Sequence, residues 1–110
     1  MEIPKKGDLV YIDFDPQSGY EQAGHRPGII LSPERFNRVT NIAVVCPITS
    51  KIKGYPFEVK LPEGLPIFGA VLTDQQKSLD WKSRGLKIIG QAPENTVKKC
   101  VNHIHKFIYE

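Results

Sequence analysis

The stretch IAVVCPI, residues 42–48, is the clearest indicator of fold class in this chain of 110 residues. It is short, apolar and rich in valine and isoleucine, which is typical of a β-strand. Five further runs of this kind are separated by glycine- or proline-containing segments: Leu9–Phe14, Gly28–Ser32, Phe57–Leu61, Gly69–Leu72 and Leu86–Gly90. Short strands at such intervals predict a mainly β (α+β) fold built on a small, strongly bent antiparallel barrel.

Two segments depart from the strand pattern. The sequence SPE at 32–34 predicts a brief helix after the second strand, with Ser32 as N-cap and Pro33 in the first turn, ending near Asn37. The segment Pro93–Tyr109 predicts an amphipathic helix lying on the sheet, because its apolar residues recur with a helical period. These apolar residues are Val97, Cys100, Val101, Ile104, Phe107 and Ile108.

Composition indicates one globular domain covering residues 1–110, with 40% apolar residues, 25% charged residues and a net charge of +3. Basic residues gather between Lys77 and Lys99, which is compatible either with a solvated surface or with a field that attracts phosphates. No apolar run approaches the ~20 residues that span a bilayer, and no signal peptide is recognisable. We therefore expect a cytoplasmic protein without membrane contact, in which Cys46 and Cys100 are small buried hydrophobic residues.

The segment DPQSGYEQAGHRP, residues 15–27, joins two predicted strands and is long for such a connection, which is typical of binding loops. It carries Arg26, whose guanidinium could clamp a phosphate or simply pair with a nearby carboxylate. Thr49 ends the third predicted strand, and its hydroxyl could contact a phosphate or merely cap a turn. Lys51 and Lys53 follow it and supply positive charge. Spacing alone leaves these alternatives open.

Several kinds of site can be excluded from the sequence. It contains no GxSxG motif, P-loop or dinucleotide fingerprint, and its two cysteines are not spaced for zinc. His103 and His105 stand two residues apart on the predicted helix and so point in different directions. We therefore expect neither a metal nor a cofactor.

The opening GDLVYIDFDPQSG is followed by four motifs: EQAGHRP (21–27), GIILSPERFN (28–37), PITSKIKGYPFEV (47–59) and LTDQQKSLDWKSRG (72–85). Together they strongly resemble the MazF/PemK family of toxin endoribonucleases, and the MazF branch in particular. The resemblance covers essentially the whole chain and implies an SH3-like fold. It further implies a homodimeric toxin of a type II toxin–antitoxin system that cuts single-stranded mRNA at specific sequences. Its antitoxin is expected to carry an acidic or flexible binding tail.

The resemblance also implies roles for individual residues. Arg26 matches the central catalytic arginine, Thr49 matches the threonine at the scissile phosphate, and Glu21 and Gln22 match the lid loop. Leu72 stands where the PemK branch has an arginine, so the acid–base scheme proposed for that branch does not transfer. Residues expected to contact RNA are Glu21, Gln22, Ser50, Lys51, Lys53, Asp74, Gln75, Lys77 and Ser78, and those expected to contact the antitoxin are Trp81, Lys82 and Arg84.

RNA carries its own nucleophile, the 2′-hydroxyl, so cleavage requires neither a protein nucleophile nor a metal. Arg26 suits stabilisation of the phosphorane, but a guanidinium is not a base, which leaves His25 and Glu21 as auxiliary acid–base candidates. Two alternatives are a gyrase poison like the CcdB toxins and a non-catalytic RNA-binding barrel. The GHRP and ITS motifs disfavour the first, and the second usually displays several exposed aromatic residues. Here we expect only Tyr20, Tyr55 and Trp81 to be exposed, with Phe57 and Phe68 in or beside apolar runs.

Overall fold

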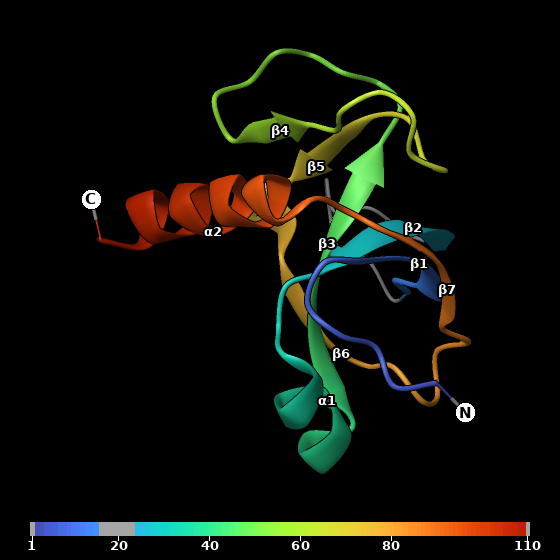
Figure 1. Ribbon diagram of the computed structural model, residues 1–110. Coiled ribbons are helices and arrows are strands. Elements are labelled where there is room, and N and C mark those ends of the chain that lie inside the picture. Colours follow the sequence, from blue (N-terminus) through green and yellow to red (C-terminus); the bar gives the residue numbers. More distant parts are fainter. Residues whose placement is uncertain (1, 16–23, 110) are drawn as a thin grey trace.

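The computed structural model describes residues 2–15 and 24–109. This part of the chain contains seven strands and two α-helices, and the predicted mainly β fold with a C-terminal helix is confirmed (Figure 1). In chain order the elements are β1 (Asp8–Asp13), β2 (His25–Ile30), α1 (Glu34–Thr40), β3 (Ile42–Thr49), β4 (Glu58–Lys60), β5 (Ala70–Leu72), the 3-10 helix η1 (Thr73–Gln75), β6 (Lys77–Asp80), β7 (Lys87–Gln91) and α2 (Glu94–Tyr109).

The strands form one antiparallel sheet in the order β4-β5-β3-β2-β1-β7, with β6 paired to β3 beside this path. The eight-residue strand β3 is the centre of the sheet, because its first half pairs with β6, its middle with β2 and its end with β5. Within the described residues β4 and β7 do not pair with each other. The sheet is therefore strongly bent, as predicted from the sequence, and its two edge strands do not close it.

Strand β3 is apolar from Ile42 to Ile48 because it contributes side chains to a core on each of its two faces. Successive residues of a strand point to opposite faces, so Cys46 enters one core cluster and Val45 the other. The Cys46 cluster lies beneath α2 and includes Leu9, Ile29 and Cys100. Cys46 and Cys100 are fully buried free thiols, which confirms their prediction as small hydrophobic residues.

Helix α2 covers the sheet with only part of its apolar face. Val97 and Cys100 are buried, and Ile104 is partly buried against the same cluster. Towards the C-terminus, Phe107 is 46% and Ile108 60% exposed, because the helix extends beyond the strands (Figure 1). The predicted packing on the sheet is therefore correct only for the first half of the helix. No described helix is long and apolar enough to cross a bilayer.

Helix α1 begins differently from the prediction. Pro33 occupies the N-cap position without a side-chain cap, and the helix runs to Thr40 rather than ending near Asn37. The Ser32 hydroxyl instead donates to Asn37 Oδ1 at 2.5 Å and accepts from the Val44 amide at 2.8 Å. Ser32 therefore ties α1 to β3 and cannot cap the helix.

Two strand assignments also differ from the prediction. Strand β6 was not foreseen, because KSLD contains a single apolar residue and gives almost no alternation signal. Strand β2 starts at His25, three residues before the predicted start, so His25 and Arg26 are strand residues. Phe68, expected near the core, is 72% exposed.

Candidate functional site

Arg26 on β2 and Thr49 on β3 belong to neighbouring antiparallel strands. These strands pair Ile29 with Cys46 and Gly28 with Pro47. Continuing the same register by two residues on each strand sets Arg26 opposite Thr49. Residues directly opposite in an antiparallel pair project from the same face of the sheet. The observed pairing ends at Gly28 and Pro47, and its register directs Arg26 and Thr49 to the same face of the sheet.

Arg26 carries a donor that no described residue of the protein uses. Its side chain is half-buried, and its Nε has no hydrogen-bond partner among the described residues although it is shielded from solvent. Leaving a buried donor unpaired costs about 1–3 kcal/mol. An anion bound beside Arg26 would offset this cost and match the guanidinium charge.

Thr49 is buried and makes the turn hydrogen bond that is one of the two roles the sequence left open. Its Oγ1 accepts a 3.1 Å hydrogen bond from the Lys51 amide, which is the role of an ordinary turn threonine. A hydroxyl has one hydrogen to donate in addition to its acceptor lone pairs. Thr49 can therefore stabilise the turn and still donate to a phosphate oxygen.

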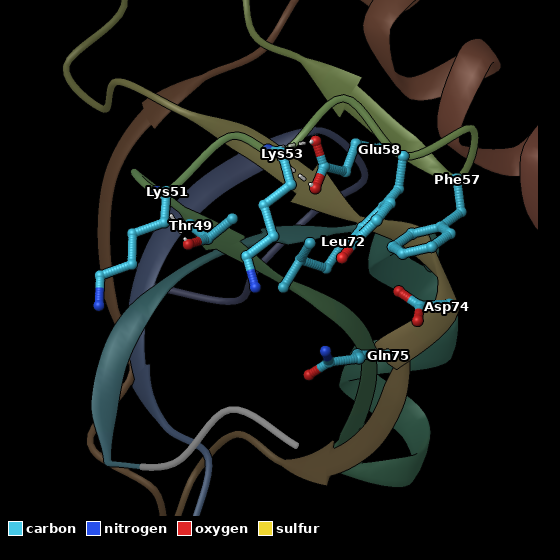
Figure 2. Close-up of a pocket in the computed structure, with 9 residues that line it drawn as sticks. Thr49, Lys51, Lys53, Phe57, Glu58, Leu72, Asp74 and Gln75 are labelled. Atoms are coloured by element: carbon cyan, nitrogen blue, oxygen red, sulfur yellow. Dashed lines mark hydrogen bonds between the residues drawn. The ribbon is translucent and has the colours of Figure 1, made fainter. Parts of the chain in front are cut away.

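A pocket of about 410 Å³ opens beside Thr49 (Figure 2). Thr49 pairs with Ala70 and Leu72 pairs with Glu58, so these residues share one face of the sheet. Lys51 and Lys53 come from the loop between β3 and β4. The full lining is Thr49, Lys51, Lys53, Tyr55, Phe57, Glu58, Leu72, Asp74 and Gln75.

Two carboxylates lie in the part of the pocket away from Thr49. Glu58 Oε1 accepts hydrogen bonds from the backbone amides of Lys53 at 3.2 Å and Gly54 at 2.9 Å. Partial burial raises the pKa of Asp74 above its ordinary value, and the negative charge of Glu58 adds to this rise. The pocket therefore has a basic end near Thr49 and an acidic, aromatic end near Asp74.

His25 lies on the other face of β2 from Arg26, because the two residues are adjacent in the strand. Its ring stacks on Tyr11 at a centroid distance of 6.0 Å, and its Nε2 lies 3.3 Å from the Gly85 carbonyl oxygen. These contacts hold the imidazole outside the pocket that Thr49 lines.

Comparisons with known proteins identify the family of this chain. Residues 5–108 match the family described as PemK-like, MazF-like toxin of type II toxin–antitoxin system. The chain belongs to the PemK/MazF toxin family. It is 48% identical over 93 residues to the endoribonuclease toxin MazF of Escherichia coli, covering 84% of this chain and 83% of that relative.

Solved structures of MazF proteins have the same fold. A MazF structure from Deinococcus radiodurans is 41% identical, covers 100% of both chains and superposes with a TM-score of 0.95. A chain of a MazE–MazF complex from the same organism is 37% identical, covers 99% of this chain and 98% of that one, and has a TM-score of 0.87.

The other residues expected from the PemK/MazF resemblance are only partly gathered at the pocket. Lys51, Lys53, Asp74 and Gln75 line it, and Ser50 is exposed beside Thr49. Lys77 and Ser78 belong to β6, and Ser78 borders a different hollow together with Val101. Glu21 and Gln22 lie outside the described residues, as does Tyr20.

The expectation that Trp81 is exposed for antitoxin contact is wrong. Trp81 is 2% exposed, and its Nε1 donates a 2.9 Å hydrogen bond to the Asn37 carbonyl oxygen. Arg84 donates to the carbonyl oxygens of Asp13, at 3.1 Å, and Asp15, so it holds the end of β1. Of these three candidates, only Lys82 is a freely presented side chain, with its Nζ 5.9 Å from the centre of the Trp81 ring.

Four lining residues, Tyr55, Phe57, Glu58 and Leu72, were not predicted as part of the site. Glu58 was detectable in principle, because a carboxylate inside the apolar run FEV is unusual for a core strand. The described residues contain no group of three or more His, Cys, Asp or Glu that could hold a metal ion. His105 packs instead on Tyr109, with a ring-centroid distance of 4.7 Å.

Proposed function

We propose that this protein is the toxin of a type II toxin–antitoxin pair and acts as a sequence-specific, metal-independent endoribonuclease on single-stranded mRNA. Cleavage would stop translation and growth. The observation that carries the proposal is the pocket that presents Thr49, Lys51 and Lys53, together with a β2–β3 register that sets Arg26 on the same face of the sheet as Thr49. Family membership and the endoribonuclease activity of the relatives support it.

The proposed reaction uses the 2′-hydroxyl of RNA as its nucleophile. The 2′-oxygen bonds to phosphorus, the bond from phosphorus to the 5′-oxygen breaks, and the 2′-hydroxyl proton leaves to a base while the 5′-oxygen gains a proton. The products are a 2′,3′-cyclic phosphate and a 5′-hydroxyl. Arg26 stays protonated and stabilises the dianionic phosphorane, and Thr49 donates to one of its oxygens.

The auxiliary acid–base assignment now favours Glu21 over His25. His25 is held on the far face of β2 by Tyr11 and Gly85, where a role in positioning the strand fits its contacts. Glu21 remains the proposed acid–base residue carried over from the family motif.

We propose that the protein acts as a homodimer and binds an antitoxin with an acidic or flexible tail. The surplus of basic residues would attract such a tail, so the association should weaken with added salt. Exposed apolar side chains on α2, among them Phe107 and Ile108, support burial of this helix against another chain. We place the protein in the cytoplasm, where its proposed mRNA substrate is found. Sedimentation at micromolar concentration tests the dimer, which a purely monomeric protein would contradict.

The test of function is incubation of the purified protein with a long RNA in EDTA. We expect discrete fragments from the wild-type protein and intact RNA from Arg26→Ala of unchanged fold. A gyrase poison or a binding-only module would leave the RNA intact in both samples, and this result would overturn the proposal.

A further inference from the structure

The acidic, aromatic end of the pocket has a chemistry that a phosphate does not need. Asp74 and Glu58 would repel a phosphate, whereas Thr49 and Lys51 at the other end would attract it (Figure 2). If the scissile phosphate lies at Thr49, an uncharged part of the RNA must occupy the acidic end. The nucleobase attached to a neighbouring ribose is the part that fits this requirement.

One wall of this end is aromatic. The Tyr55 and Phe57 rings lie 5.3 Å apart with an interplanar angle of 31°, and Tyr55 is 49% exposed. The Lys53 Nζ lies 6.0 Å from the centre of the Tyr55 ring. Exposed aromatic rings next to a basic groove are the usual platform on which single-stranded RNA stacks its bases.

Both walls of the acidic end are held in place by hydrogen bonds to the backbone. The Glu58 carboxylate fixes the turn at Lys53 and Gly54, which carries Tyr55. The Thr73 hydroxyl donates to the Phe57 carbonyl oxygen at 2.5 Å, and this bond ties η1, with Asp74, to the aromatic wall. The rings and the carboxylate are therefore set relative to each other before a ligand arrives, as is usual for specific pockets.

Asp74 determines which base edge fits best. An ionised carboxylate only accepts hydrogen bonds, so it pairs with N–H groups and repels carbonyl oxygens. Adenine, cytosine and guanine each carry an exocyclic amino group. Uracil has a carbonyl oxygen where cytosine has its amine, and its N3–H is flanked by two carbonyl oxygens that a carboxylate repels.

We propose that the acidic end of this pocket binds a nucleobase next to the scissile phosphate and that Asp74 selects a base with an exocyclic amino group over uracil. This subsite rests on the proposed RNA cleavage. Asp74 is thus assigned a specificity role that is separate from the roles of Arg26 and Thr49.

The first experiment maps cleavage sites in a pool of randomised single-stranded RNA for three proteins: wild type, Asp74→Asn and Glu63→Gln. Asparagine keeps the shape of Asp74 but adds a donor that suits a uracil carbonyl. Glu63→Gln removes one negative charge from an exposed residue outside the pocket. At one position beside the cut, we expect uracil to be depleted about tenfold or more by wild type and Glu63→Gln, and not by Asp74→Asn.

The second experiment deletes the amino group from the substrate instead of changing the protein. At the same position, cytosine is replaced by 2-pyrimidinone or adenine by purine. We expect wild-type kcat/KM to fall about tenfold, and the Asp74→Asn enzyme to show no comparable fall.

Two results would overturn the subsite while leaving RNA cleavage intact. One is free acceptance of uracil by the wild-type enzyme at every position near the cut. The other is an unchanged base preference in Asp74→Asn. Absence of any cleavage by the wild-type protein would overturn the proposed function, and the subsite with it.

Discussion

The Gly54 backbone amide donates a 2.9 Å hydrogen bond to Glu58 Oε1, which links the loop after β3 to the first residue of β4. Gly54 has a φ of +77°, a conformation that suits glycine, and the chain turns here to bring Tyr55 over the pocket. The same oxygen accepts from the Lys53 amide at 3.2 Å. Glu58 therefore shapes one wall of the pocket without needing to touch the scissile phosphate.

We predict that Glu58→Ala raises KM for RNA about tenfold with little change in kcat, because the loop that carries Lys53 and Tyr55 loses its anchor. Steady-state cleavage of a short fluorogenic RNA measures both constants. Glu58→Gln retains an acceptor oxygen and should restore most of the loss. If the Glu58→Ala enzyme keeps the wild-type KM, the Glu58 anchor is not needed for RNA binding.

Trp81→Phe should lower the free energy of unfolding by about 1–3 kcal/mol, because the buried Asn37 carbonyl oxygen loses its indole donor. Guanidinium titration followed by circular dichroism measures this change. Antitoxin affinity should stay near the wild-type value, since Trp81 is 2% exposed. A stable variant that binds antitoxin poorly would restore Trp81 as a contact residue.

The two buried thiols predict a fall in stability at alkaline pH. Burial raises the pKa of Cys100 from 9.0 to about 12 and also raises the pKa of Cys46. Unfolding returns both thiols to their ordinary range, so above about pH 9 the unfolded state releases protons that the folded state retains. The contribution of the two thiols to the free energy of unfolding is complete below about pH 9. It is lost as the pH rises towards 12.

The measurement is the free energy of unfolding at pH 8 and pH 10, for wild type and for a Cys46→Ala, Cys100→Ala double variant. Each thiol contributes a slope of at most about 1.4 kcal/mol per pH unit, and the double variant should lack this part. If the free energy of unfolding falls equally with pH in the two proteins, the buried thiols do not cause the fall.

Arg26→Ala should slow cleavage about 10²–10³-fold, because a well-placed donor to the phosphorane lowers the barrier by about 3–4 kcal/mol. Thr49→Ala should be less severe than Arg26→Ala, since a neutral hydroxyl donates a weaker hydrogen bond. Thr49→Ser keeps the hydroxyl and serves as the matched control. A Thr49→Ala enzyme as active as wild type would remove Thr49 from the site.

The strands that carry dense apolar side chains could be predicted from sequence, and IAVVCPI marks the central strand correctly. The edge strand KSLD could not, because its pairing with β3 is a tertiary contact without a local hydrophobic pattern. Trp81 was misjudged for a related reason. Its lysine neighbours indicated a surface, whereas the Asn37 carbonyl that satisfies its indole lies 44 residues away in sequence.

Site candidates could be named from the sequence where chemistry and motif coincide, as at Arg26 and Thr49. Their juxtaposition depends on the register of β2 against β3, which no local pattern specifies. The sequence predicted His25 and Arg26 in a loop. Both lie in strand β2, so as neighbours they point to opposite faces of the sheet. The aromatic wall and Glu58 depend on the turn at Gly54 and were visible only in the fold.

The most direct test of the account is cleavage of two otherwise identical RNAs, one with 2′-deoxyribose immediately 5′ of the scissile bond. The account predicts that the all-ribose RNA is cut in EDTA to a 2′,3′-cyclic phosphate and a 5′-hydroxyl. The deoxy-substituted RNA should resist cleavage at that bond, because its nucleophile is missing. Efficient cutting of the deoxy-substituted RNA would contradict the proposed mechanism.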